Sequence, residues 1–217
     1  MKIDKIVFLG SGGGGNLKFI NEYTKIIPEV NVCGVLSDRE CGAINYAKKE
    51  NIFSEVLSFE RNKRGNKELI QALEKLNPDL IITNVHKILS ESVVSEFSGK
   101  LINLHYSYLP AYGGKIGMKP VDLAIQRNNS FIGTTSHYVT REVDAGRIIS
   151  QGIFDRYKVK DIYQKTFVTG ALTLLSAIYH LKHDEPASRI FEDSIISPSS
   201  KKIDEKLVKK IFAQLKT

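Results

Sequence analysis

An amide, an imidazole and a carboxylate stand where they could act on one substrate. Asn103 and His105 alternate with apolar residues in the run Lys100–His105, so a strand of period two points both side chains to the same face. Asp144 follows in a polar loop between two extended-looking stretches. Such a loop can fold back over a neighbouring strand end, where a carboxylate raises the pKa of an imidazole and holds its orientation. The sequence therefore predicts one polar site.

The chemistry that suits these three groups is direct transfer. The chain has no serine or cysteine in an evident nucleophile elbow, and its five histidines lack the spacing of metal ligands. Asn103 would donate a hydrogen bond to a carbonyl oxygen as it becomes an oxyanion. His105, paired with Asp144, would stabilise that charge and help to move a proton from an attacking amine.

A glycine-rich loop near the N-terminus indicates a second site. The apolar run Lys5–Leu9 is followed by Gly10–Asn16 and then by apolar residues at helical spacing from Leu17. Glycines let backbone N–H groups approach a phosphate, and the start of a helix adds favourable partial charge. No Gly-Lys-Ser/Thr follows, so the loop is not a Walker A motif. The pattern favours an anion site.

Two other interpretations of this loop stay open. Gly10, Gly12 and Gly15 satisfy G-x-G-x-x-G, with Asp38 after the next apparent strand as a ribose ligand, which would indicate a dinucleotide-dependent oxidoreductase. Asp38 lies later than the usual offset of about 20 residues, however, and four consecutive glycines satisfy many patterns. The loop could also be a flexible turn without a ligand.

Taken together, three segments resemble the phosphoribosylglycinamide formyltransferases, the folate-dependent enzymes of purine biosynthesis. They are Ser11–Leu17, Asn103–Pro110 and Gly133–Gln151, and the likeness runs from about residue 5 to 182. The resemblance implies transfer of formyl from 10-formyltetrahydrofolate to a primary amine, with no metal. It also implies an α/β fold with a mostly parallel, Rossmann-like sheet, helices on both faces and an antiparallel edge pair.

The same resemblance assigns residues to roles. It places catalysis on Asn103, His105 and Asp144 and the substrate phosphate on the glycine loop, and it lets two segments border the folate. The phosphate residues are Gly12, Gly13, Gly14, Gly15 and Asn16, and the folate residues are Lys87, Ile88, Leu89, Thr140, Arg141, Glu142 and Val143.

Several positions depart from the family pattern and concern the amine acceptor. Tyr106 stands where proline is common after the histidine, and the Tyr106–Pro120 loop is longer and basic. Gly170 stands where the family usually has a glutamate facing the ribonucleotide. Lys87 replaces a usual arginine, which keeps the charge but loses the planar fork. An acceptor that is a nucleotide-linked amino sugar therefore stays open, as does a non-catalytic folate or nucleotide-binding protein.

The elements that must position these residues alternate as in a parallel α/β sheet. We expect strands at Asn31–Ser37 and Pro78–Asn84 besides those named above, and an antiparallel pair at Phe131–Thr140 and Arg147–Phe154. The expected helices are Cys41–Glu50, Lys67–Asn77, Ser90–Phe97, Pro120–Arg127 and Ile162–Leu181. Ligands of open α/β sheets bind beyond the carboxyl ends of the strands, where Asn103, His105 and the glycine loop lie.

The composition fits one globular domain. The 217 residues are 42% hydrophobic and 25% charged, and no apolar signal or membrane segment is visible, so we expect a cytoplasmic protein with free thiols at Cys33 and Cys41. The net charge of +7 is spread along the chain without a nucleic-acid motif, and it suits anionic small ligands.

We expect residues 1–200 to form the catalytic domain. Residues 201–217 have apolar positions at four-residue spacing, which predicts an amphipathic helix packed on this domain or on a partner subunit. A homodimer therefore stays open. Among the remaining histidines, His86 is a candidate for ligand contact, whereas His137, His180 and His183 are expected to be structural or solvated.

Overall fold

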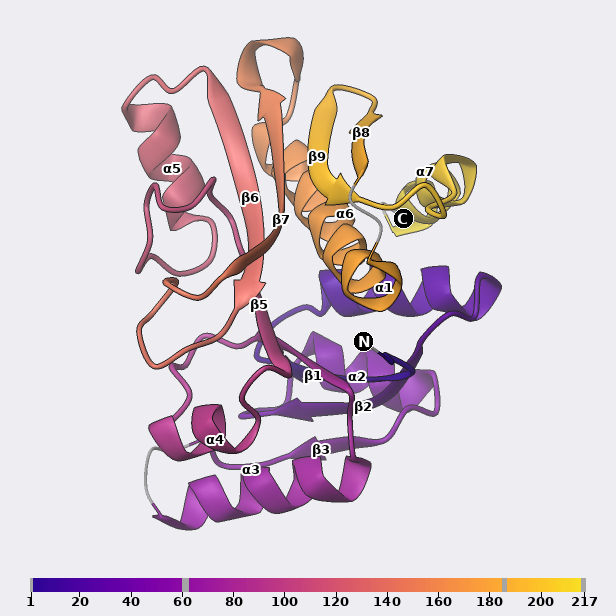
Figure 1. Ribbon diagram of the computed structural model, residues 1–217, viewed down its shortest axis with the longest axis vertical. Helices are drawn as coiled ribbons and strands as arrows, with labels where there is room; N and C mark the ends of the chain where they lie inside the picture. The colour runs from indigo at the N-terminus through magenta and orange to yellow at the C-terminus, as the bar shows by residue number, and fades with distance from the viewer. Residues whose placement is uncertain (1, 60–62, 185–186, 216–217) are drawn as a thin grey trace. The chain divides into compact units, whose positions relative to one another are not determined.

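The computed structural model describes residues 2–59, 63–184 and 187–215, and the chain divides into two compact units. The amino-terminal unit comprises residues 2–102 together with the chain end from residue 213, and the carboxy-terminal unit comprises residues 103–212. Figure 1 shows the course of the chain through both units. The glycine loop lies in the first unit, and the residues predicted for catalysis lie in the second.

The amino-terminal unit is built on parallel strands. β1 (Lys5–Gly10) pairs with β2 (Asn31–Ser37) and with β4 (Leu80–Asn84), and β2 pairs with β3 (Ser54–Val56), in the order β3-β2-β1-β4. β1 is buried from its second residue onward, so it is the apolar centre of this sheet. The prediction of β2 is confirmed residue for residue.

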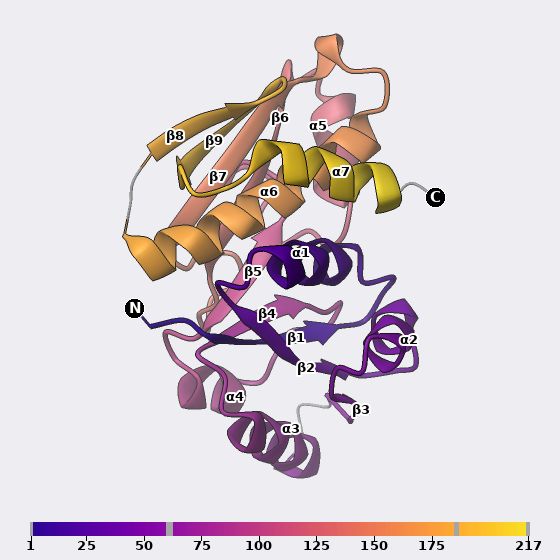
Figure 2. The same cartoon turned by 90° about the vertical axis from the view of Figure 1, so that its right-hand side faces the viewer.

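Helices cover both faces of this sheet. α1 and α2 lie together on one face, and α3 and α4 lie together on the other (Figure 2). The four helices are α1 (Gly15–Ile26), α2 (Gly42–Lys49), α3 (Lys63–Leu76) and α4 (Glu91–Glu96). Because β1, β2 and β4 are parallel, their carboxyl ends lie at the same edge of the sheet, and the loops that follow them gather there.

β5 (Leu101–His105) begins in the amino-terminal unit and ends in the carboxy-terminal one. Leu101, Ile102, Leu104 and His105 are buried, and Asn103 is partly buried. The strand therefore delivers the amide and the imidazole two residues apart, as the period of two predicts.

The carboxy-terminal unit contains an antiparallel sheet. β6 (Phe131–Tyr138) pairs with β7 (Ile148–Asp155), β7 with β9 (Ser194–Ser199), and β9 with β8 (Ala187–Phe191). The predicted antiparallel pair is confirmed and is extended by the β8–β9 hairpin, which the sequence analysis does not predict. The hairpin escapes prediction because its strands are short and are joined by two acidic residues rather than by Asn-Gly or Asp-Gly.

The long helix α6 (Ile162–His183) packs on one face of this antiparallel sheet. Hydroxyl pairs hold the two together, since Thr173 lies 2.8 Å from Thr134 on β6 and Thr169 lies 2.8 Å from Ser194 on β9. Gly152 on β7 leaves room for this packing, because a Cβ there would lie 2.5 Å from the Thr173 hydroxyl. The remaining helices are α5 (Lys119–Gln126), the short 3₁₀ helix η1 (Arg156–Lys158) and α7 (Glu205–Leu215).

The predicted C-terminal helix is present as α7 over residues 205–215. Its apolar side is buried, and Phe212 meets Phe167 of α6 edge to face at 5.9 Å between ring centroids. The last two residues of the predicted segment, 216–217, lie outside the described residues. No helix within the described ranges is long and apolar enough to cross a membrane.

Candidate functional site

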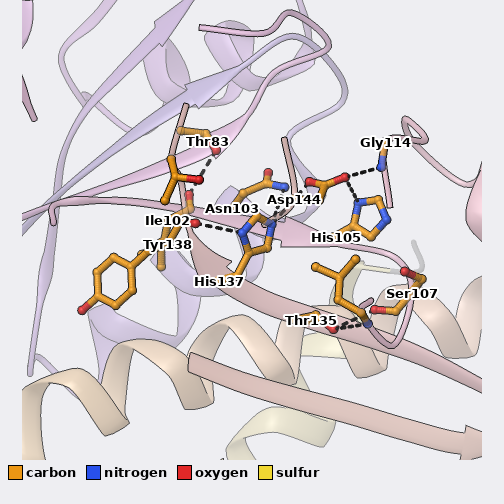
Figure 3. Close-up of polar contacts among 12 residues, drawn as sticks. Thr83, Ile102, Asn103, His105, Ser107, Gly114, Thr135, His137, Tyr138 and Asp144 are labelled. Carbon is orange, nitrogen blue, oxygen red and sulfur yellow. Dashed lines mark hydrogen bonds and ion pairs between the residues drawn. The ribbon is translucent and has the colours of Figure 1, made fainter. Parts of the chain in front are cut away.

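The predicted trio comes together in the carboxy-terminal unit. His105 Nδ1 lies 3.4 Å from Asp144 Oδ2, and both side chains are at most 10% exposed. Figure 3 shows the two side chains facing each other, with Asn103 beside the aspartate. The residues come from β5 and from the loop between β6 and β7, so the predicted fold-back of that loop over the strand end is confirmed.

His137 joins this cluster, although the sequence analysis predicts a structural role for it. Its Nε2 lies 3.3 Å from the Asn103 amide nitrogen and 3.5 Å from Asp144 Oδ1 (Figure 3). Its Nδ1 lies 2.9 Å from the Tyr138 carbonyl, which can only accept, so Nδ1 carries the hydrogen. Nε2 is the ring nitrogen that faces both the Asn103 amide and the Asp144 carboxylate, so His137 orients these two groups. The signal in the sequence is that His137 is the last but one residue of β6, the strand leading into the Asp144 loop.

The β6–β7 loop holds Asp144 by backbone geometry. Asp144 adopts a left-handed conformation with φ of 56°, and the Gly114 N–H donates to its Oδ2 at 2.8 Å. Gly146 is required in the same turn, because a Cβ there would lie 1.8 Å from the Tyr138 carbonyl oxygen. The carboxylate is thus fixed on both sides, by its own turn and by the Gly113-Gly114 segment.

Buried polar contacts hold the loop that follows His105 against the sheet. The Thr135 hydroxyl donates to the Ser107 carbonyl at 2.8 Å and accepts from the Leu109 N–H at 3.0 Å, and the Gln151 amide donates to the Leu109 carbonyl at 3.0 Å. Gly133 admits the loop, since a Cβ there would lie 2.5 Å from the Tyr108 Cβ. Since every partner is buried or partly buried, the loop is a rigid support for the imidazole.

The electrostatics of the cluster favour a neutral imidazole next to a carboxylate. Burial lowers the pKa of His105 below its ordinary 6.5, although Asp144 and the Tyr112 carbonyl, 3.2 Å from Nε2, act in the opposite direction. The pKa of Asp144 is also lowered: burial raises it, but hydrogen bonds from His137 and Gly114 and the charge of the imidazoles outweigh that effect. His105 is therefore able to accept a proton near neutral pH.

Two departures from the family pattern are in contact. Gly170 on α6 faces Tyr106, and a Cβ at Gly170 would lie 2.7 Å from the Tyr106 ring. The ring also packs against the cluster of Val121, Ala124, Ile132 and Phe154. A cavity of about 40 Å³ adjoins it, lined in part by Tyr106, Tyr108 and Tyr112. The Tyr106 ring thus occupies the space that a side chain at residue 170 would need.

The glycine loop lies in the amino-terminal unit, at the start of α1. Gly14 caps the helix in a left-handed conformation with φ of 74°, and no side chain caps the helix. A Cβ at Gly14 would lie 2.9 Å from the Ala43 backbone, whereas Cβ atoms at Gly12 and Gly13 would meet nothing within 4 Å. The loop therefore packs on α2, while the space beside the α-carbons of Gly12 and Gly13 is open, which suits the approach of an anion to the backbone.

Asp38 lies beside this loop, at the end of β2. Its carboxylate accepts from the Ser11 hydroxyl at 2.7 Å and from Arg39 Nη2 at 2.6 Å, and Lys87 Nζ lies 3.4 Å away. These partners, the largest influence being Arg39, hold the pKa of Asp38 well below its usual range. With both oxygens engaged within the protein, Asp38 does not favour the ribose-binding role of the dinucleotide interpretation.

The residues predicted to border the folate fall in both units. In the amino-terminal unit, Lys87 and Ile88 are exposed and Leu89 is buried. In the carboxy-terminal unit Thr140, Arg141, Glu142 and Val143 are all exposed on the loop that carries Asp144, and the Thr140 hydroxyl donates to the Glu142 carbonyl at 2.9 Å. The backbone N–H of His86, rather than its side chain, approaches Ser11 Oγ at 3.4 Å.

Neither metal ligands nor a disulfide occur among these groups. Within the described ranges, no three His, Cys, Asp or Glu side chains are grouped so that they could hold a metal ion. Cys33 and Cys41 are free thiols, as predicted, but both are half-buried rather than buried.

Comparison with known proteins finds relatives of this chain. The formyl transferase family model matches residues 4–178. A phosphoribosylglycinamide formyltransferase of Haemophilus influenzae is 31% identical over 172 residues, covering 75% of this chain and 79% of that protein. The chloroplastic phosphoribosylglycinamide formyltransferase of Vigna unguiculata is 32% identical over 160 residues, covering 69% of this chain and 50% of that protein. The chain thus spans about half the length of the plant relative.

A solved structure has the same fold. The glycinamide ribonucleotide transformylase 1 of Symbiobacterium toebii superimposes with a TM-score of 0.76, covering 88% of this chain and 92% of that chain, at 21% sequence identity. At this identity the likeness concerns the fold, and it confirms the predicted α/β class with its mostly parallel sheet.

Proposed function

Since the chain belongs to the formyl transferase family, we propose that it transfers a formyl group from 10-formyltetrahydrofolate to a primary amine, most simply that of phosphoribosylglycinamide, in purine biosynthesis. The observation that carries the proposal is the assembly of Asn103, His105 and Asp144 in one buried cluster of the carboxy-terminal unit. Relatives that bear the name phosphoribosylglycinamide formyltransferase support this choice of acceptor.

In this proposal the three residues share the charge and the proton of the reaction. The amine nitrogen bonds to the formyl carbon, and the carbonyl oxygen becomes an oxyanion that accepts a hydrogen bond from Asn103. Neutral His105 takes the proton that the attacking amine loses, while Asp144 stabilises the imidazolium. The bond from the formyl carbon to the folate nitrogen then breaks, and that nitrogen gains a proton. His137 positions Asn103 and Asp144.

The binding roles follow the sequence assignments. In the amino-terminal unit, the backbone of Gly12–Gly15 with Asn16 holds the acceptor phosphate, and Lys87–Leu89 border the folate. In the carboxy-terminal unit, Thr140–Val143 border the folate. Residues 1–200 act as the catalytic domain, no metal takes part, and the protein works in the cytoplasm, which the free thiols of Cys33 and Cys41 support.

The acceptor is tested by measuring loss of the formyl donor and mass of the product with phosphoribosylglycinamide and with nucleotide-linked amino sugars. Formylation of the ribonucleotide at the higher kcat/KM is the expected result. Formylation of an amino sugar alone would instead show that the acceptor is a different amine, in line with the departures from the family pattern at Tyr106 and Gly170. Release of formate without a formylated amine would make water the acceptor and would overturn the transfer proposal.

A further inference from the structure

Asp38 is a buried carboxylate outside the catalytic cluster that holds three loops of the amino-terminal unit. Its side chain is 1% exposed, yet it contacts Ser11 in the glycine loop, Arg39 next to it in the chain and Lys87 in the loop after β4. A buried carboxylate costs free energy unless it is paired and hydrogen-bonded, and here both oxygens have partners. Because its contacts join the loops at the carboxyl ends of β1, β2 and β4, the Asp38 carboxylate holds these loops in place.

The partners of Asp38 keep it charged. Arg39 bonds it through two guanidinium nitrogens, Nε at 3.2 Å and Nη2 at 2.6 Å, and Lys87 adds a second cation at 3.4 Å. The pKa of the carboxyl is accordingly held far below neutral pH. The hydrogen bond that it accepts from the Ser11 hydroxyl is therefore charge-assisted and strong.

Ser11 closes a ring of contacts through its hydroxyl. The hydroxyl donates to Asp38 Oδ1 at 2.7 Å and accepts from the His86 N–H at 3.4 Å, while the Ser11 N–H donates to the Asn84 carbonyl at 3.3 Å. Lys87, next to His86 in the chain, returns to Asp38. Ser11, which directly precedes Gly12–Gly15, is thus linked by these contacts to the segment assigned to the folate.

We propose that Asp38 is a positioning residue that locks the glycine loop through Ser11 in its phosphate-binding shape and couples that loop to the folate-bordering segment through Lys87. The inference rests on the proposed function for the identity of the two ligands. Ordering of the 86–87 segment by a folate tightens the ring and hence the phosphate site, and the coupling is reciprocal. Lys87 then acts chiefly as a link to Asp38.

Phosphate binding measured without turnover tests this role. Inorganic phosphate is titrated into the full chain, with and without tetrahydrofolate, and the amide resonances of Gly12–Gly15 are followed. In Ser11→Ala, which changes no charge, the phosphate dissociation constant is expected to rise by ~10-fold, the worth of a charge-assisted hydrogen bond. Ser11→Thr, which keeps the hydroxyl, restores binding. Unchanged phosphate affinity in Ser11→Ala would overturn the proposal.

Asp38→Asn gives a test whose sign is decisive. Loss of a negative charge by itself favours the binding of an anion. If Asp38 acted only through its charge, the Asp38→Asn protein would therefore bind phosphate more tightly than the wild type. The positioning role predicts weaker binding instead, with Glu40→Gln as the control because Glu40 is an exposed carboxylate paired with Lys48. Tighter binding in Asp38→Asn would contradict the proposal.

Lys87→Met tests the coupling between the folate-bordering segment and the phosphate site. The Lys87 side chain is 43% exposed, so the variant is expected to fold. Wild-type protein is expected to bind phosphate ~5-fold more tightly when it is saturated with tetrahydrofolate, a typical coupling between sites, and the variant, also saturated, is expected to lose that factor. Lys48→Met, at an exposed ion pair with Glu40, keeps it. No effect of tetrahydrofolate in the wild type, or a full effect in Lys87→Met, would overturn the coupling. Because no step needs formyl transfer, failure of the proposed function alone would leave these results intact.

Discussion

Two buried aspartates, Asp144 and Asp38, stand in environments of opposite kind. Asp144 is surrounded by imidazoles, an amide and a backbone N–H, whereas Asp38 is held by a guanidinium, an ammonium and a hydroxyl. Both have a lowered pKa. Asp144 is paired with imidazoles, which can exchange a proton, and Asp38 with a guanidinium and an ammonium, so the two carboxylates suit different tasks.

The difference separates proton handling from fixed binding. A carboxylate next to a neutral, buried imidazole can respond to a proton that arrives during a reaction. A carboxylate that neutralises permanent cations cannot respond within the physiological range, but it can hold a loop in one shape. Variants at Asp144 should therefore change the rate of the chemical step, and variants in the Asp38 ring should change ligand affinity.

The largest effect is expected for Asp144→Asn. The variant loses the charge that stabilises the His105 imidazolium, and kcat should fall by roughly 10²–10⁴-fold, the usual contribution of a general base and its partner. KM for both substrates should change little in steady-state assays. Asp193→Asn, an exposed aspartate in the β8–β9 turn, is the matched control and should have wild-type kcat. A raised KM with an unchanged kcat would show that Asp144, like Asp38, acts on binding, and would contradict the difference proposed between the two aspartates.

Glycines of the two regions should differ in their effect on stability. Gly146→Ala puts a methyl group against the Tyr138 carbonyl, so the free energy of unfolding should fall by about 2–3 kcal/mol, with loss of activity as Asp144 moves. Gly12→Ala meets open space and should change stability by less than about 0.5 kcal/mol. Chemical denaturation of both variants checks this pair, and a stable Gly146→Ala would show that the Asp144 turn is not constrained as described.

His137→Gln should lower kcat by ~10-fold, because the Asn103 amide and Asp144 lose an orienting partner but no general base. The control is His183→Gln at the end of α6, where the imidazole contacts Lys202. Transfer rates at saturating substrates measure the effect. A wild-type rate in His137→Gln would show that His137 has only a structural role, as its place in the sequence predicts.

The pH dependence should show the smallest effect. The pKa of His105 is lower in the folded protein than its ordinary 6.5, so the unfolded chain binds more protons once pH falls through about 6.5, and stability decreases there. Above that pH the group contributes no pH dependence. The loss should be visible in denaturation curves between pH 7 and 5 and should be smaller in His105→Asn. An equal loss in His105→Asn would assign it to other groups.

Sequence patterns with a strict period are the part of the fold that could be predicted. β2 is predicted at its observed bounds, and β5 starts one residue later than expected, because buried strands of α/β sheets are apolar runs. The β8–β9 hairpin could not be predicted, since its polar, short strands are held by pairing with β7 and by α6 rather than by their own propensity.

For the site, chain order indicates which residues carry chemistry but does not show which of them meet. Asn103 and His105 follow from the period of two within one strand. The position of Asp144 depends on a turn with Gly146 and on the Gly114 N–H, which only the folded loop brings together. The Tyr106–Gly170 contact and the contacts of Asp38 with Ser11 and Lys87 join segments that are distant in the chain, so no local pattern could indicate them.

The most direct test of the central claim is a single-turnover measurement with excess protein, following a labelled formyl group of 10-formyltetrahydrofolate with phosphoribosylglycinamide present, in wild type and His105→Asn. Wild type is expected to move the label to the amine, and His105→Asn is expected to be slower by roughly 10²–10⁴-fold while it still binds both ligands. Equal rates in the two proteins, or label recovered only as formate, would contradict it.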